Sequence, residues 1–251
     1  MNAAPHPNAR RRAVVPVAVI GVSLVLIVLV TLQQWGSSTS AAPQAPQGSG
    51  APTAVATAAP SGAQTPREDL TVYERRDAGD PLSAGSVDAP VALVVFSDYQ
   101  CGYCAKWSAD TLPTLLAYAE RGDLWIEWRD LNIFGAPSER ASRASYAAGL
   151  QSAFWEFHDQ LFPGGATRSE AELSDDALVA LAVGLGLDAD RFASDMSSAE
   201  TVAAVEANAQ LGYSLGASST PSFLLGGTPI VGAQPTEVFV EAIDAALAAQ
   251  G

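Results

Sequence analysis

Two cysteines, Cys101 and Cys104, stand three positions apart and are the only thiols in the sequence. An uninterrupted apolar run over residues 91–96 precedes them, and such a run is typical of a strand buried on both faces. An amphipathic stretch follows them and extends to Gly122. This order predicts a strand, a short turn and a helix, with Cys101 at the helix N-terminus and Cys104 one turn along.

This placement favours thiol–disulfide chemistry. Unpaired backbone N–H groups and the positive end of the helix dipole stabilise a thiolate at Cys101, and the pKa of thiols in such positions falls to ~3.5–7.5. Cys104 lies on the same face of the helix, near enough to close a disulfide. The spacing therefore predicts that Cys101 attacks and that Cys104 acts as the resolving thiol.

Two other uses of the cysteines fit less well. A structural disulfide between them would close a loop of four residues, which contributes ~2 kcal/mol in the chain-entropy account, against ~4.7 kcal/mol for a loop of a hundred. A tetrahedral zinc site needs four ligands, and His6 and His158 do not form a second ligand pair at finger spacing. We expect a redox site without a metal or an organic cofactor.

The sequence around the cysteines resembles the DsbA-like branch of the thioredoxin superfamily. The matching segments follow the family order over roughly residues 70–251, and a CxxC pair combined with an aromatic helix and a later Thr-Pro pair is specific to this branch. The segments are residues 89–91, 96–104, 125–131, 154–162 and 219–223. The resemblance implies an α/β thioredoxin fold with an inserted helical subdomain at about residues 131–215.

The resemblance also implies a set of substrate-binding residues. In the family, the proline that matches Pro221 is cis and its loop lies against the cysteines, while the residue that matches Thr220 offers its backbone to an extended substrate strand. Gly102 and Tyr103, between the cysteines, complete the expected substrate surface. They replace the Pro-His or Pro-Tyr of many DsbA-like proteins, and Val95 stands where many members of the superfamily have an acid.

Other residues that could take part in chemistry have simpler roles in this interpretation. Asp98, three positions before Cys101, is expected to have a turn or surface role rather than a direct role in proton transfer. Lys106, the only lysine, is expected to be exposed. His158 is expected to be structural, since the sequence offers it no catalytic partner. The neighbouring aromatic residues are expected in the core: Phe154, Trp155, Phe157 and Phe162.

Apolar periodicity and capping residues predict the rest of the domain. Helices are expected over residues 138–151, 152–162, 174–185 and 189–211 in the insertion, with a closing helix over 236–249. Short strands are expected over residues 223–225 and 229–231. Ser174 and Asp188 are the expected N-caps of the third and fourth helices.

The first 36 residues predict a membrane segment. Residues 13–32 carry no charge and are rich in Val, Ile and Leu, and a helix of that length spans the ~30 Å hydrocarbon layer. Three arginines at 10–12 precede it, which places residues 1–12 in the cytoplasm by the positive-inside rule. We expect an uncleaved single-pass anchor over residues 13–36, and a cleaved secretory signal is the alternative. Both interpretations export the remainder.

Charge and composition separate the exported part into a linker and a domain. Residues 37–69 are rich in Ala, Pro and Ser, with Val55 as the one large aliphatic residue, so they predict a disordered tether. Residues 70–251 hold 25 acids and nine bases. The whole chain has a formal net charge of −14, which argues against general nucleic-acid binding because that needs a clustered basic face.

Together these features predict a membrane-tethered, extracytoplasmic thiol-disulfide oxidoreductase. The expected activity is disulfide donation to reduced or unfolded exported client proteins during oxidative protein folding. Reoxidation would then require a membrane oxidase that passes electrons to quinone. A reductase or isomerase with the same cysteines is the alternative among enzymes, and a peptide-binding, chaperone-like module is the alternative from another class.

Overall fold

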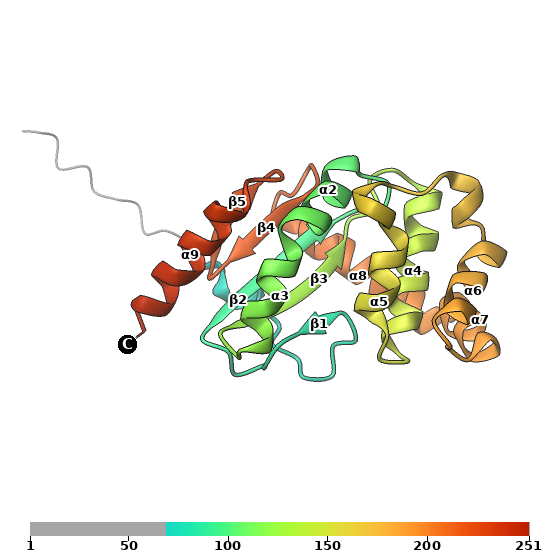
Figure 1. Ribbon diagram of the computed structural model, residues 1–251, viewed down its shortest axis with the longest axis horizontal. Helices are drawn as coiled ribbons and strands as arrows, with labels where there is room; N and C mark the ends of the chain where they lie inside the picture. Colours follow the sequence, from blue (N-terminus) through green and yellow to red (C-terminus); the bar gives the residue numbers. More distant parts are fainter. Residues whose placement is uncertain (1–68, 251) are drawn as a thin grey trace, which may run out of the picture. The chain divides into compact units, whose positions relative to one another are not determined.

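The centre of the fold is a mixed sheet of five strands (Figure 1). The computed structural model describes residues 69–250. The strands are β1 (Ser83–Ala84), β2 (Val91–Ser97), β3 (Leu124–Asp130), β4 (Ser222–Leu225) and β5 (Thr228–Val231), in the order β1-β3-β2-β4-β5. β2 and β3 are parallel, and the other neighbours are antiparallel. A parallel pair needs a crossover connection, and helices supply it here.

The central strands β2 and β3 are buried along their whole length. Since successive side chains of a strand point to opposite faces, β2 contributes to two cores. Leu93 and Val95 belong to the core on one face of the sheet, and Val94 and Phe96 belong to the core on the other. This two-sided burial explains the uninterrupted apolar run in the sequence and confirms the predicted strand.

Helices cover both faces of the sheet (Figure 1). The face that carries Leu93 and Val95 is covered by α2 (Gly102–Asp110), α3 (Leu112–Glu120) and α9 (Thr236–Ala248). The opposite face is covered by the end of α8 (Ala199–Ser214) and by the 3-10 turn η3 (Leu70–Tyr73). The described chain thus has the layered α/β arrangement that the sequence predicts.

The helix after the cysteines ends earlier than the sequence predicts. The single amphipathic stretch to Gly122 is divided at Thr111 into α2 and α3. Pro113 lies in the first turn of α3, where its missing N–H is tolerated, whereas the same proline could not continue α2. α2 is therefore a nine-residue helix whose first turn carries Cys104.

The predicted helical insertion lies between β3 and β4. It consists of α4 (Ala136–Gly149), α5 (Phe154–Leu161), the 3-10 turns η4 (Pro163–Gly165) and η5 (Glu170–Leu173), α6 (Asp175–Gly184), α7 (Ala189–Ser197) and α8. Ser174 and Asp188 cap α6 and α7 as predicted. The prediction of one helix over residues 189–211 is wrong, because Ser198 is extended and caps a new helix: its Oγ accepts the Thr201 N–H at 3.1 Å.

The expected cytoplasmic residues 1–12, the membrane segment 13–36 and all of the linker 37–69 except Asp69 lie outside the described residues. Within residues 69–250, no helix combines the length and the apolar character needed to cross a membrane.

A buried ion network fastens the chain before β2 to the sheet. Arg129 of β3 is fully buried, and its Nη2 lies 2.8 Å from Glu127 Oε2 and 2.6 Å from Asp80 Oδ2. Glu127 also accepts the backbone N–H of Arg76 at 2.7 Å. Charges buried in this way are tolerated because each has an oppositely charged or hydrogen-bonding partner.

Replacing Arg129 with methionine should lower the free energy of unfolding by ~3–5 kcal/mol, because the carboxylates of Glu127 and Asp80 would stay buried without their cation. Urea denaturation of the reduced protein measures the change. Arg121→Met is the control, since the Arg121–Asp123 pair is exposed and its removal should change the stability by less than ~1 kcal/mol. A similarly small effect at Arg129 would contradict the prediction.

Candidate active site

Cys101 is the N-cap of α2, and Cys104 lies in the first turn of that helix. The Cys104 N–H donates to Cys101 Sγ at 3.3 Å, so the helix start supplies a backbone donor to this sulfur as the sequence predicts. Both cysteines are free thiols. Cys104 is completely buried and Cys101 is 4% exposed, so Cys101 is the sulfur that a substrate can reach.

The two thiols have opposite acidities. The hydrogen bond from the Cys104 thiol, helped by Thr220 and by the backbone N–H groups of Cys104 and Tyr103, lowers the pKa of Cys101 to about 6 despite its burial. Burial raises the pKa of Cys104 far above its ordinary range, and the hydrogen bond to Cys101 raises it further. At neutral pH the pair therefore consists of a Cys101 thiolate and a Cys104 thiol.

The loop before β4 lies directly against Cys101. The Thr220–Pro221 peptide bond is cis, as the family resemblance implies. Cys101 Sγ is 3.3 Å from the carbonyl oxygen of Thr220, and the carbonyl of Pro221 accepts the Gly232 N–H at 2.9 Å. The loop is thus fixed between the helix that carries the cysteines and the end of β5.

The other predicted substrate residues border the same sulfur. A Cβ atom placed on Gly102 would meet nothing within 4 Å, and the Tyr103 side chain is 72% exposed. The structure therefore brings Cys101, Gly102 and Tyr103 together with the Thr220–Pro221 loop. Cys101 and Thr220 are 119 residues apart in the sequence. Their roles in binding a substrate remain predictions.

Comparison with known proteins places this geometry in a family. The thioredoxin family profile matches residues 77–245. The chain belongs to the thioredoxin family. It is a DsbA-like thiol-disulfide oxidoreductase of that superfamily, as the resemblance in the sequence implies.

Three similar proteins illustrate the relationship. A protein of Bacillus cereus named as a probable disulfide bond formation protein D is 24% identical over 168 residues, which are 62% of this chain and 78% of that protein. The crystal structure of oxidised BdbD from Bacillus subtilis matches with a TM-score of 0.60 and 24% identity over 67% of this chain and 93% of that chain. A Na⁺/H⁺ antiporter NhaA of Herminiimonas arsenicoxydans is 30% identical over 161 residues, but these are 64% of this chain and only 25% of the antiporter.

Asp98 has the turn role that the sequence predicts, but the predicted surface position is wrong. The residue is fully buried. Its carboxylate accepts the N–H of Gln100 at 2.7 Å, the N–H of Phe134 at 3.2 Å and the hydroxyl of Ser138 at 2.6 Å. Asp98 therefore ties the turn before Cys101 to the start of the helical insertion, and its backbone carbonyl accepts the Cys101 N–H at 3.0 Å.

The remaining polar residues behave largely as predicted. Lys106 is exposed and pairs with Asp110. His158 is fully buried, and its ring nitrogens contact the Tyr99 hydroxyl and the Ser108 hydroxyl, each at 3.2 Å. Burial lowers the pKa of His158 to about 3, so the ring is neutral at physiological pH and its role is structural. The predicted core aromatics Phe154, Phe157 and Phe162 are buried, and Trp155 packs against them half-buried.

Two buried polar residues near the cysteines escaped the sequence analysis. Ser97 and Asp130 end the neighbouring strands β2 and β3 and stand opposite each other in the register. Burial raises the pKa of Asp130 to about 7, although its Oδ1 accepts the Trp128 Nε1–H at 3.0 Å. For Ser97, the signal in the sequence is a polar residue at the end of the apolar run of β2; Asp130 follows the charged residues Glu127 and Arg129 of β3 and has no such signal.

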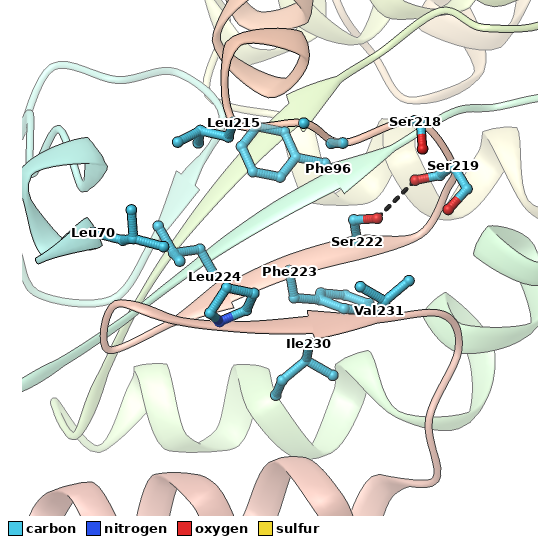
Figure 2. Close-up of a pocket in the computed structure, with 13 residues that line it drawn as sticks. Leu70, Phe96, Leu215, Ser218, Ser219, Ser222, Phe223, Leu224, Ile230 and Val231 are labelled. Atoms are coloured by element: carbon cyan, nitrogen blue, oxygen red, sulfur yellow. Dashed lines mark hydrogen bonds between the residues drawn. The ribbon is translucent and has the colours of Figure 1, made fainter. Parts of the chain in front are cut away.

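An apolar pocket of about 140 Å³ adjoins the Thr220–Pro221 loop. Figure 2 shows Phe96, Leu215, Leu224 and Val231 around it, and Ser222 Oγ donating to the Ser219 carbonyl at 2.7 Å at its rim. The lining residues carry no charge. The pocket therefore suits an uncharged side chain next to the loop.

Titration of the reduced protein should show a thiolate absorbance near 240 nm that rises with a midpoint near pH 6. Cys101→Ser should abolish this midpoint, and Cys104→Ala should move it upward because the thiol donor is lost. Cys104→Ser keeps a hydroxyl donor and should give a smaller shift. A midpoint at the ordinary thiol pKa of ~8.5 in the wild type would contradict the assignment.

The same thiolate should make the stability of the reduced protein depend on pH. Because the folded-state pKa of Cys101 is lowered, its contribution is complete above the ordinary pKa of ~8.5 and is lost as the pH falls through about 6. Urea denaturation at pH 5, 7 and 9 should show this gain with rising pH in the wild type relative to Cys101→Ser.

Proposed function

We propose that the protein is an extracytoplasmic disulfide donor for oxidative protein folding. The observation that carries the proposal is the set of hydrogen-bond donors on Cys101, which lowers the pKa of this thiol to about 6. A stabilised thiolate favours the reduced state of the pair. The oxidised protein therefore tends to give its disulfide to a client, as strong thiol oxidants do.

The exchange needs only the two cysteines and the client. A client thiolate attacks Cys101 Sγ of the Cys101–Cys104 disulfide, and the bonding electron pair leaves with Cys104 Sγ. A second client thiolate attacks the client sulfur of the mixed disulfide, and Cys101 leaves as a thiolate. The client gains a disulfide, and the protein is left with two reduced cysteines. The low pKa of Cys101 makes it a good leaving group in the second step.

The surroundings of Cys101 support an extended polypeptide as the substrate. Thr220 has its carbonyl beside Cys101, Gly102 leaves open space, and Tyr103 presents an exposed ring. An unfolded client can place its backbone along the Thr220–Pro221 loop and an apolar side chain in the adjoining uncharged pocket. The Bacillus cereus relative is named for disulfide bond formation, which agrees with reduced exported proteins as clients.

The proposed location and reoxidising partner rest on the expectations for residues 1–69. Residues 13–36 would anchor the protein, or serve as a secretory signal, with residues 1–12 in the cytoplasm. Residues 37–69 would tether the catalytic domain, residues 70–251, outside the cell membrane. In that position a membrane oxidase linked to quinone would restore the Cys101–Cys104 disulfide.

The equilibrium reduction potential against glutathione tests the donor direction. The pKa of about 6 for Cys101 lies between those of thioredoxin, ~7, and DsbA, ~3.5, so the expected potential is above the ~−270 mV of thioredoxin, in the direction of the ~−120 mV of DsbA. A value near ~−270 mV, typical of a thioredoxin, would contradict the proposal and favour a reductase.

Refolding of a reduced, disulfide-containing client tests the use of the cysteines. The oxidised wild type should restore client activity, whereas Cys101→Ser and Cys104→Ser, which hold no disulfide to donate, should not. Cys104→Ser that first carries glutathione in a mixed disulfide at Cys101 should release glutathione when a client thiol attacks Cys101, and should accumulate the mixed disulfide with the client. If Cys101→Ser protects or oxidises the client as well as the wild type does, the domain acts as a peptide-binding module instead.

A further inference from the structure

Ser97 carries a buried hydroxyl without an ordinary partner. It is the last residue of β2 and is 1% exposed. Within residues 69–250, its Oγ makes no hydrogen bond of normal geometry. A buried hydroxyl left unpaired lowers stability, and Thr220 Oγ1, the hydroxyl of the loop beside Cys101, is unpaired in the same way.

The Ser97 side chain lies on the same side of the sheet as the resolving thiol. Alternate residues of β2 share a face, and Val95, two positions earlier, packs in the core that includes Cys104. Cys104 is buried in the first turn of α2, the helix that covers this face at the end of β2, and hydrogen bonding from the Ser97 side chain lowers the pKa of that thiol. The donor that has no partner therefore stands next to a sulfur that must become negative during exchange.

The groups around Cys104 offer little other stabilisation for a negative charge. Cys101 on α2 raises its pKa as a thiolate would, and Asp98 and Asp130, at the ends of β2 and β3, are acids. Tyr99 has its pKa raised by burial, and His158 on α5 is neutral. The contacts that lower the pKa of Cys104 come from two hydroxyls, those of Ser97 and Thr220.

The hydroxyls of Thr220 and Ser97 differ in which thiol pKa they lower. Thr220 acts on both cysteines, since it lowers the pKa of Cys101 as well. Ser97 lowers the pKa of Cys104, whereas the hydrogen-bond partners of Cys101 Sγ are the Cys104 N–H and the Thr220 carbonyl, each at 3.3 Å. A change at Ser97 can therefore alter the resolving thiol without altering the attacking one.

We propose that Ser97 is a catalytic residue whose hydroxyl donates a hydrogen bond to Cys104 Sγ as this sulfur leaves or attacks. The proposal rests on the thiol–disulfide exchange described above. When a thiolate attacks Cys101 Sγ, the Cys101–Cys104 disulfide breaks and its bonding electron pair stays on Cys104 Sγ. The Ser97 O–H then donates a hydrogen bond to this negative sulfur. The Cys104 thiolate then takes up one proton, which balances the proton that the attacking thiol released. In the reverse direction the same donor stabilises the Cys104 thiolate before it attacks.

The step in which Cys104 attacks can be isolated with glutathione. Reduced protein mixed rapidly with oxidised glutathione forms the mixed disulfide at Cys101, and Cys104 then expels the bound glutathione. Acid quenching at a series of pH values gives the rate of the second step and the apparent pKa of Cys104. The full chain is used, so no separate folding of a fragment is assumed.

Ser97→Ala should slow the expulsion of glutathione about tenfold at pH 7, as expected for loss of one hydrogen bond to a charged group. The apparent pKa of Cys104 measured in this step should be higher in Ser97→Ala than in the wild type, while the midpoint of the Cys101 titration near pH 6 should stay unchanged. Ser97→Thr keeps the hydroxyl and should restore most of the rate. The free energy of unfolding of Ser97→Ala should be equal to or higher than that of the wild type, because the hydroxyl has no folded-state partner to lose.

The matched control is Ser145→Ala, which removes another fully buried hydroxyl, one that donates to the Ser142 carbonyl within α4 at 2.9 Å. It should leave the glutathione step unchanged. A rate within twofold of the wild type together with an unchanged apparent pKa in Ser97→Ala would overturn the proposal, and so would Ser97→Thr being as slow as Ser97→Ala. A protein that completes the glutathione step but fails to oxidise clients would contradict the donor function and not the role of Ser97.

Discussion

Hydrogen bonding from Cys104 to the Cys101 sulfur, which includes the backbone N–H of Cys104 at 3.3 Å, is the interaction on which the chemistry of this fold depends. It lets one sulfur of the pair exist as a thiolate with a pKa of about 6 while the other keeps its proton. The bond forms because Cys101 caps α2 and Cys104 is in its first turn. β2, buried on both faces, fixes where that helix begins, and the Thr220–Pro221 loop closes over the reactive sulfur.

At this site the thiolate is stabilised by neutral hydrogen-bond donors rather than by charged groups. Val95 occupies the position where many members of the superfamily have an acid, and Lys106 is drawn away to Asp110 at the surface. Asp98 is the acid closest to Cys101 along the chain. Its carboxylate accepts hydrogen bonds from two backbone N–H groups and from the Ser138 hydroxyl. Acidity at the cysteines is therefore set by thiol, hydroxyl and backbone donors, whose effect survives screening by salt better than that of surface charges does.

The sequence predicts the elements that local patterns define. The apolar run before Cys101 and the caps Ser174 and Asp188 each carry a local physical signal, and the structure confirms them. Helix ends at Thr111 and Ser198 were missed, because the apolar periodicity continues across both and only Pro113 and the Ser198 cap interrupt it. The Asp98 contacts and the unpaired Ser97 hydroxyl could not be predicted, since they depend on which strand and helix ends meet in three dimensions.

Burial of Cys104 determines which sulfur is attacked first, and it also raises the free energy of the Cys104 thiolate that the reaction must form. An attacking thiolate can reach only Cys101, because Cys104 is completely buried, so a mixed disulfide forms at one defined sulfur. The same burial makes a Cys104 thiolate costly, because a desolvated charge is destabilised in the protein interior. A positive charge beside Cys104 would relieve that cost but would also stabilise its thiolate at rest and weaken the hydrogen bond that lowers the pKa of Cys101. Hydroxyl donors avoid this conflict, since they stabilise the sulfur most when it becomes negative and leave the resting thiol protonated.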